Sequence, residues 1–441
     1  MAMESGMISV DRWGNGSQAY FLTHLHADHT QGLSPSWRKG PLFCSRVSAV
    51  LFPSKFPGFD LSLLRVVDVG NWYSLSLLSP SSASSTHVHF MPLDAHHCPG
   101  AVMYLFRGEF GCELHTGDFR WEERSDRALI GREMLLNALK DVKLDFLYMD
   151  NTYCNPSYSF PSREVAARQV VNIIASYPKH DVVIAIDSLG KENLLVYISR
   201  VLKIKIWVWP ERLQTMHLLG FRDIFTTKTS LTRVRAIPRY SFSIETLEAL
   251  NIRRPTIGIM PSGLPWLVKT DGGNNNTFGS SRLVCNHDES SWHSNAATSS
   301  KPSCPNKDSN IFERYHQYIY TVPYSDHSCF AELQDFVKLL KPVNIKGIVT
   351  KAPCCINPMY YFGHLCGTKQ ASKVLHQKPG TIRIDRVEAA RIKSSTRSGD
   401  SRVKRKKSVK KLEHATVHVG RVSILRRVRR GAKILDTDCI D

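Results

Sequence analysis

Short runs in which apolar and polar residues alternate fill the first part of the chain, and most of them end at small polar residues or at a glycine turn. Alternation at a period of two is typical of strands with one buried face. Strands are therefore expected at residues 7–11, 17–24, 87–95 and 144–150, and a hairpin at residues 101–106 and 111–115.

From Ser162 onward, apolar residues recur at spacings of three and four, which predicts a helix. Further strands are expected at residues 182–186, 204–209, 318–324 and 344–349, and further helices at residues 193–202 and 330–340. Strands and helices in alternation make βαβ units, so the pattern predicts an α/β fold.

Four potential metal ligands fall within six positions at the end of one expected strand: His24, His26, Asp28 and His29. On extended backbone, His24 and His26 point to the same side. Asp28 and His29 follow where the chain turns, so they can face a second, adjacent point. Imidazole and carboxylate are suitable ligands for two neighbouring metal ions. A polar loop whose histidines bond backbone carbonyls is the alternative, and the density of the cluster disfavours it.

Other strand ends offer residues to complete this site. His97 precedes a Pro-Gly turn and is preferred over its neighbour His96, whereas His87 and His89 fit ordinary strand positions. Asp118 follows Gly117 at a strand end, and a short carboxylate there can touch two cations at once. Asp11, at the end of the first strand, is either an outer partner that orients a metal-binding histidine or a turn cap.

A loop between an expected strand and a helix start, residues 188–191, has the layout of an anion site. Ser188, Gly190 and Lys191 lie where backbone N–H groups of a helix start are free to bind a phosphate. Lys191 either adds a positive charge or is an exposed first-turn lysine. Ser262 and Gly263 are the second candidates for such a pocket.

Composition limits the function classes. A length of 441 residues predicts two domains with additional segments, and 42% apolar residues suit a globular core. No apolar run is long enough for a membrane span, and residues 1–6 lack the features of a secretory signal. The 11 cysteines include no C-x-x-C pair, which favours an intracellular protein over a disulfide framework.

Positive charge is concentrated near the C-terminus. The chain carries a net +19, and residues 386–433 hold 17 Lys/Arg against three acids, a local excess of +14. Such a tail suits a polyanionic partner or a nuclear-import signal, although a solvated basic tail has the same composition. Residues 271–310 are rich in Asn, Ser and Gly and are expected to be a disordered insertion, in which a zinc site of Cys285, His287, His293 and Cys304 fits no common spacing.

Several motifs together resemble a known family. Asp94-Ala-His-His-Cys-Pro-Gly-Ala, Thr116-Gly-Asp-Phe-Arg, Asp150-Asn-Thr-Tyr-Cys, Ser188-Leu-Gly-Lys-Glu and Tyr324-Ser-Asp-His-Ser resemble the metallo-β-lactamase/β-CASP DNA cross-link repair nucleases. Within that family the match is best to the Apollo-type 5′ exonucleases, with Artemis a near relative. The resemblance covers about residues 7–375. It implies an αββα metallo-β-lactamase sandwich with an inserted β-CASP α/β domain.

The resemblance also implies a division of the chain and a set of roles. Residues 1–150 and 319–380 would form the metallo-β-lactamase domain, residues 151–318 the β-CASP domain, and residues 381–441 a basic, disordered tail. His24, His26 and His97 would hold one zinc ion with Asp118, while Asp28 and His29 would hold a second, again with Asp118. Asp150 and His327 would handle protons or contact the scissile phosphate, which makes Asp28, Asp118, Asp150 and His327 the catalytic set.

Val349 stands where RNA-cleaving relatives have a histidine that binds metal, so the second zinc site would lack one protein ligand. The implied function is therefore a nuclear, zinc-dependent 5′-to-3′ exonuclease that acts on single- and double-stranded DNA in interstrand cross-link repair, with telomere-end processing as an extension. Protein partners remain unidentified. Four alternatives stay open: an Artemis-like endonuclease, an RNA-processing nuclease, a small-molecule metallohydrolase and an inactive DNA-end scaffold.

Overall fold

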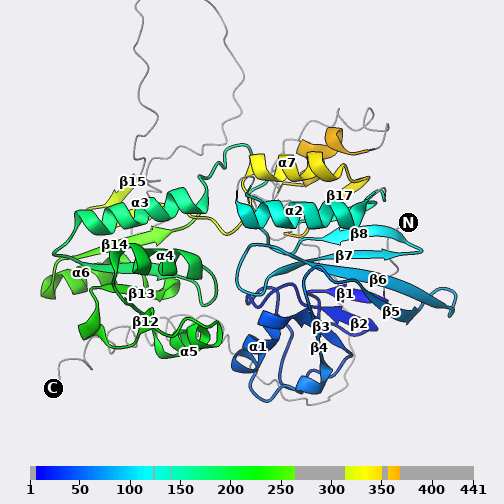
Figure 1. The fold of residues 1–441 in the computed structure, drawn as a ribbon, viewed down its shortest axis with the longest axis horizontal. Helices are drawn as coiled ribbons and strands as arrows, with labels where there is room; N and C mark the ends of the chain where they lie inside the picture. Colours follow the sequence, from blue (N-terminus) through cyan, green and yellow to red (C-terminus); the bar gives the residue numbers. More distant parts are fainter. Residues whose placement is uncertain (1–5, 123–124, 141, 264–312, 350–355, 368–441) are drawn as a thin grey trace, which may run out of the picture. The chain divides into compact units, whose positions relative to one another are not determined.

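The computed structural model describes residues 6–122, 125–140, 142–263, 313–349 and 356–367, and these residues form an α/β fold with three sheets (Figure 1). The expected insertion at residues 271–310 and the expected tail at residues 381–441 lie outside the described residues. Among the described helices, none combines the length and the apolar character that a membrane crossing requires.

Two of the sheets form a sandwich. The four-stranded sheet is parallel and comprises β1 (Ile8–Val10), β2 (Ala19–Phe21), β3 (Leu42–Ser45) and β4 (Leu64–Val67). The six-stranded sheet has the order β17 (Asn344–Gly347), β9 (Phe146–Met149), β8 (Gly111–His115), β7 (Val102–Gly108), β6 (Ser85–Asp94) and β5 (Tyr73–Leu78). Buried aromatic side chains fill the space between the sheets, among them Phe21, Phe43, Phe90 and Phe106.

Helices cover the outer faces of this sandwich. α2 (Asp126–Leu139) and α7 (Phe330–Leu340) place Leu135 and Phe336 against Leu114 and Leu147 of the six-stranded sheet. α1 (Arg46–Lys55) covers the four-stranded sheet on the other side of the sandwich (Figure 1). The layers are therefore α, β, β and α, the fold class expected from the resemblance.

The third sheet has seven strands and belongs to the segment that follows residue 150. Its order is β12 (Phe225–Thr226), β11 (Ile206–Trp207), β13 (Val234–Pro238), β10 (Asp181–Ile186), β14 (Thr256–Pro261), β16 (Ile319–Val322) and β15 (Glu313–His316), of which only β15 runs antiparallel to its neighbour.

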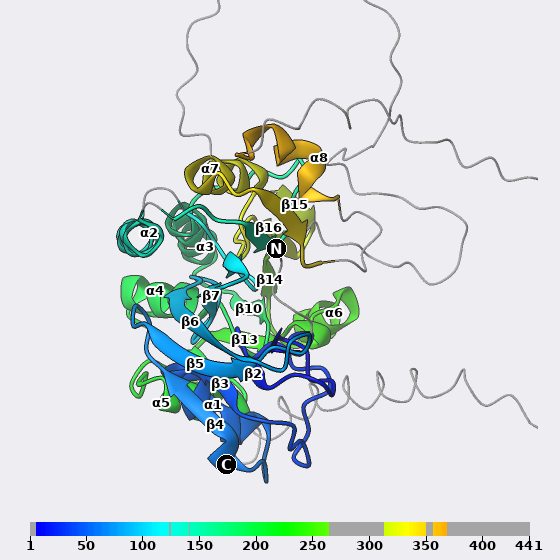
Figure 2. The ribbon, with the colours of Figure 1, turned by 90° about the vertical axis from the view of Figure 1, so that its right-hand side faces the viewer.

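Helices lie on both faces of this third sheet. α3 (Arg163–Ser176) and α4 (Glu192–Leu202) pack on the face that carries Val182, Ile184 and Ile186. α6 (Ile244–Arg253) lies on the opposite face, where Leu247 comes close to Gly258 (Figure 2). α5 (Pro210–Leu218) contributes Met216 to the core, and α8 (Pro358–Phe362) packs near β17.

Three features differ from the sequence pattern. α1 forms although it contains Pro53, which lies in its last turn. α2 was not predicted, because its buried side includes the small residues Ala128, Gly131 and Ala138 rather than a large apolar stripe. β16 pairs with β14, so the chain returns to the six-stranded sheet at β17 and not at the expected boundary after residue 318.

Candidate metal centre and its cleft

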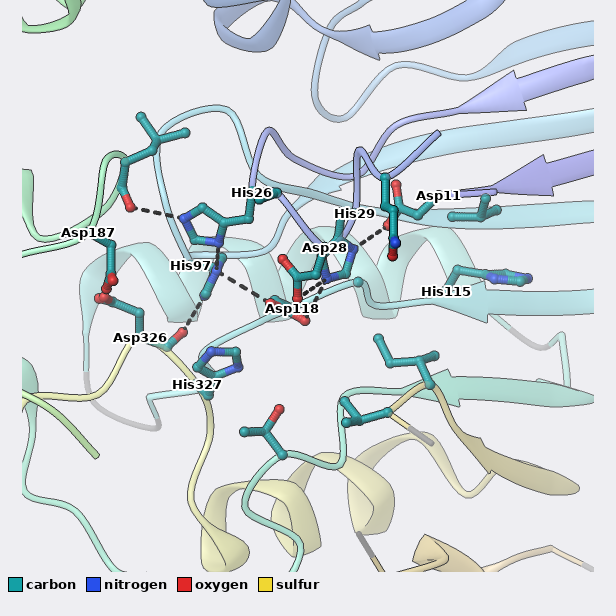
Figure 3. A pocket seen from close by; sticks show the side chains of 18 of the residues that line it. Asp11, His26, Asp28, His29, His97, His115, Asp118, Asp187, Asp326 and His327 are labelled. Atoms are coloured by element: carbon teal, nitrogen blue, oxygen red, sulfur yellow. Dashed lines mark hydrogen bonds and ion pairs between the residues drawn. The ribbon is translucent and has the colours of Figure 1, made fainter. Parts of the chain in front are cut away.

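Side chains from three strand ends meet around one point (Figure 3). They are His24, His26, Asp28 and His29 after β2, His97 after β6, and Asp118 after β8. The two carboxylate oxygens of Asp118 face different partners. Oδ2 lies 3.6 Å from Nε2 of His24 and 3.6 Å from Nε2 of His97, whereas Oδ1 lies 3.2 Å from Nε2 of His29. Asp118 thus stands between two groups of potential ligands.

The remaining side chains of the cluster lie on either side of Asp118. On one side, His26 Nδ1 is 3.0 Å from His97 Nε2. On the other, Asp28 Oδ2 is 3.7 Å from His29 Nε2, and the Asp28 side chain is 77% exposed. The first group is therefore enclosed, whereas the second opens to solvent.

The outward nitrogen of each histidine is held by another group. Nδ1 of His24 is 3.0 Å from the Thr23 hydroxyl, and Nδ1 of His97 is 2.8 Å from the carbonyl oxygen of Asp326. Nε2 of His26 is 2.9 Å from the carbonyl oxygen of Leu189. Such partners fix the ring orientation and the tautomer of metal-binding histidines.

Asp11 provides the same support for His29. Its Oδ2 lies 2.7 Å from Nδ1 of His29 and accepts the Thr23 hydroxyl at 2.6 Å, while Oδ1 accepts the Thr23 N–H. Asp11 itself has a φ of 51°, a left-handed conformation that aspartate tolerates better than most residues. Of the two readings of Asp11, its contacts fit the outer partner of a metal ligand.

The cluster fits a metal centre. Nε2 of His24 is buried and forms no hydrogen bond with any described residue, and it faces Asp118. Burial lowers the pKa of His24 well below its ordinary value, so the ring is neutral and has a lone pair to offer. For His29, burial also lowers the pKa, but Asp118 and Asp11 outweigh it and raise the pKa to about 11. Two carboxylates around one imidazole leave an excess of negative charge, which a bound cation would neutralise.

Gly117 sets the direction of Asp118. Its φ is +52°, and an added Cβ would lie 2.7 Å from Cβ of Thr23. Thr23 in turn contacts Asp11 and His24. The glycine therefore allows the strand end that carries Asp118 to approach the strand end that carries the histidines.

Asp150 and His327 form a pair beside this cluster. Nδ1 of His327 lies 2.8 Å from Oδ2 of the buried Asp150, whose other oxygen accepts the Thr152 N–H. His327 also has a ring nitrogen in the group it forms with His97 and Asp118. Burial lowers the pKa of His327, but Asp150 and Asp118 outweigh it and raise the pKa to about 9. The pair presents a protonated imidazole to the same space as Asp118.

The expected phosphate loop is placed in part as predicted. A cleft of about 1320 Å³ joins the metal cluster to the seven-stranded sheet, and Ser188, Lys191, Ser262 and Gly263 line it, whereas Gly190 is not among its lining residues. The expectation of a free N–H at Gly190 is wrong, because that N–H donates to Glu192. Glu192 also pairs with the buried Arg212 at 2.7 Å.

Lys191 is neither solvated nor free. Its ammonium lies 3.0 Å from Asp326 and 3.3 Å from Asp187, and its side chain is 10% exposed. Because two carboxylates already neutralise it, a phosphate in this part of the cleft would meet hydroxyl and backbone donors more than a free cation.

The sequence pattern missed the residues that connect the loops of the site. Arg120 is fully buried and donates to the carbonyl oxygens of Ser325 and Pro161, and it pairs with Glu332 at 2.9 Å. Arg163 pairs with Glu122 at 3.0 Å and donates to the carbonyl oxygen of His96. Arg120 stands inside the Thr116-Gly-Asp-Phe-Arg motif, and this position was the one signal available for it.

A cluster of histidines and aspartates at the strand ends of an αββα sandwich, next to a second α/β sheet, defines a metallo-β-lactamase-fold protein with residues that could hold a metal. The family model described as "DNA repair metallo-beta-lactamase" matches residues 222–352. Residues 222–352 of the chain are thus similar to the DNA repair family of metallo-β-lactamase proteins.

Similar proteins include "5' exonuclease Apollo" from Gallus gallus, 35% identical over 79% of this chain and 63% of that protein. The Apollo protein of Danio rerio is 32% identical over 88% of this chain and 58% of that protein. "DNA cross-link repair protein SNM1" from Arabidopsis thaliana is 32% identical over 77% of this chain and 62% of that protein. The chain thus spans less than two thirds of the length of each of these relatives.

Proposed function

We propose that the protein is a metal-dependent DNA nuclease that hydrolyses phosphodiester bonds from 5′ ends, in the nucleus, in the repair of interstrand cross-links. The observation that carries the proposal is Asp118, whose two oxygens face two groups of ligands inside one cleft. Relatives named 5′ exonuclease and DNA cross-link repair protein favour DNA as the substrate.

We propose zinc as the metal, in one or two sites, because a set of histidines with one aspartate is a common donor set for that ion. His24, His26, His97 and Asp118 would hold the first ion, and Asp28, His29 and Asp118 the second. The exposed Asp28 favours weaker binding at the second site. When bound, such ions polarise phosphoryl oxygens and lower the pKa of water.

The other side chains would bind and orient the substrate and hold a proton. His327 would keep its proton at Nε2, because Nδ1 faces Asp150, and would donate to an oxygen of the scissile phosphate or of the leaving group. Ser188, Ser262 and Gly263 would contact the phosphate at the 5′ end. Lys191 would position Asp326, whose carbonyl oxygen contacts His97.

The same proposal divides the chain. Residues 1–150 together with β17 and the residues after it would form the metal-binding domain. The segment between residue 151 and β16 would form the β-CASP domain, which distinguishes a nuclease from a small-molecule metallohydrolase of the same fold. Val349, half-buried at the edge of the cleft, offers no metal ligand, and this favours DNA over RNA as the substrate.

One experiment tests the proposal. Purified protein is incubated with end-labelled single-stranded and duplex DNA, with a 5′ phosphate or a 5′ hydroxyl, with and without a chelator, and bound metal is measured by elemental mass spectrometry. We expect mononucleotides released from the phosphorylated 5′ end, zinc in the wild type, and loss of both in Asp118→Asn. Internal cuts would favour the Artemis-like endonuclease, and bound zinc without cleavage of any DNA would contradict the nuclease.

A further inference from the structure

Part of the six-stranded sheet faces the cleft instead of the other sheet. The aromatic core of the sandwich covers the inner faces of β6 and β7, through Phe90 and Phe106. On the last three strands, the same face carries His115, Tyr148 and Lys346, which all line the cleft. Arg12, which follows β1, lines the same cleft. We call these four residues the open sheet face.

The register of the strands aligns these side chains. Lys346 of β17 is opposite Tyr148 of β9, and Tyr148 is opposite His115 of β8, so the three form a row across the sheet. The rings of His115 and Tyr148 are stacked with centroids 4.1 Å apart, and the Lys346 ammonium lies 6.0 Å from the centre of the Tyr148 ring. The flat sides of the rings are therefore covered by neighbours. Nε2 of His115 lies 3.5 Å from Glu113, so the Tyr148 hydroxyl and Nδ1 of His115 are the polar groups at the ring edges that face no described partner.

Two of the cations on the open sheet face are not neutralised. Arg12 and Lys346 are exposed and form no ion pair within the described part of the chain. Lys191, at the other end of the cleft, is neutralised by two carboxylates. Arg12 lies near enough to Tyr148 to oppose the increase in pKa that burial and Glu113 cause in this tyrosine. Arg12 and Lys346 thus keep unpaired positive charge on the open sheet face, whereas the charge of Lys191 is already paired.

The order of the groups along the cleft shows on which side of the metal cluster the open sheet face lies. Asp187 and Asp326 lie on one side of the metal cluster, and His115 lies on the other side, on the strand that leads to Asp118 (Figure 3). His115 and Asp118 are three positions apart, with Thr116 and Gly117 between them, so their backbones lie at most about 10 Å from one another. That span corresponds to about three steps of a stacked strand at 3.4 Å each.

We propose that the open sheet face binds the sugar-phosphate backbone of the substrate strand on the 3′ side of the scissile bond. Arg12 and Lys346 contact phosphates as charges, and the Tyr148 hydroxyl and the His115 ring donate hydrogen bonds to backbone oxygens. The inference rests on the proposed function, because a 5′ end held near Ser188 sends the rest of the strand past the metals toward His115. The proposal thus gives a role to four residues that are not needed to hold a metal.

The test uses the full-length protein and 5′-phosphorylated single strands of two lengths, a dinucleotide and an oligonucleotide of roughly ten nucleotides. Binding is measured in the presence of chelator, by fluorescence anisotropy, over a series of salt concentrations. For Lys346→Gln and Arg12→Gln, we expect affinity for the longer strand to fall about fivefold each. The salt slope should fall by about 0.7, the value for one lost phosphate contact on a single strand. Binding of the dinucleotide should not change, because it does not reach the open sheet face.

Lys179→Gln is the matched control, because Lys179 is exposed and lies on the turn before β10, outside the cleft. In cleavage assays with metal, Lys346→Gln should raise KM for the longer strand and leave kcat and dinucleotide hydrolysis unchanged. If Lys346→Gln and Arg12→Gln behave like the control while the wild type binds and cuts DNA, the open sheet face is not a DNA site and the proposed function stands. A wild type that neither binds nor cuts DNA overturns both.

Discussion

Asp11 is the residue on which the more exposed half of the metal cluster depends. It holds His29 through Nδ1 and binds Thr23 with both of its oxygens, although it does not face Asp118. Asp11→Asn keeps the size and the left-handed backbone preference but removes the charge. We expect metal affinity or activity to fall about 10- to 100-fold, as is usual when such an outer partner is lost. Competition with a chromophoric chelator measures this. Asp68→Asn, which breaks only a surface pair with Arg46, is the control, and equal affinities for the two variants would contradict the assigned role.

Gly117 controls how closely two strand ends approach. Because an added Cβ would meet Thr23 at 2.7 Å, Gly117→Ala must shift either the Asp118 loop or Thr23. We expect the variant to be less stable by about 1–3 kcal/mol, from strain at a positive φ, and to bind less metal. Gly16→Ala is the control, because its φ is also positive but no atom would contact the new Cβ. Unchanged metal content in a folded Gly117→Ala protein would show that the spacing of the strand ends is not critical.

Among the helices and strands, the sequence predicted the ones in which buried apolar residues recur at a regular spacing. α7 matches the expected range because Leu333, Phe336, Val337 and Leu340 form one apolar stripe. The strand ends that carry His24 and Asp118 were found because polar residues stop an apolar run abruptly. α2 was missed because alanine and glycine on its buried side give little contrast. The pairing of Arg120 with Glu332 joins residues 212 positions apart, and no local pattern encodes a contact of that kind.

That pairing is what attaches α7 to the loop of Asp118. The Arg120 side chain is 0% exposed and the Glu332 side chain 15%, so removal of Glu332 leaves the buried Arg120 with only its longer contact to Glu122, at 3.8 Å. We expect Glu332→Ala to lower the free energy of unfolding by about 3–5 kcal/mol. Urea denaturation measures this, with Glu164→Ala as the control, since its exposed pair with Arg168 contributes at most about 1 kcal/mol. The double variant Arg120→Met, Glu332→Leu should recover much of the loss. If Glu332→Ala changes stability no more than the control, the pair does not stabilise the fold.

For the molecule as a whole, the sequence predicted which residues would gather at the metal cluster better than how the cleft continues beyond it. His24, His97 and Asp118 were identifiable because each follows a strand. The ion pair that neutralises Lys191 could not be predicted from the sequence, since its partner Asp326 is 135 positions away. The open sheet face follows from the register of β8, β9 and β17, which only the tertiary structure provides. Local patterns thus predicted the residues of the cluster, and long-range pairing decided which cations of the cleft remain unpaired among the described residues.

We expect the basic region near the C-terminus to be a second source of DNA affinity, with an effect that can be separated from that of the cleft. Residues 386–433 carry an excess of +14, the larger part of the net +19 of the chain. Each phosphate that a lysine or arginine neutralises releases counterions, so affinity that comes from this region should fall steeply with salt. A protein shortened after residue 385 should therefore bind DNA more weakly at low salt, with a shallower slope of log affinity against log salt.

Cleavage of a bound 5′ end should remain nearly unchanged, because the metal cluster and the open sheet face lie outside the deleted region. Anisotropy titrations and single-turnover cleavage of the two proteins provide the comparison. Equal salt slopes would mean that the basic region does not contact DNA, and the substrate would then be held by the cleft alone.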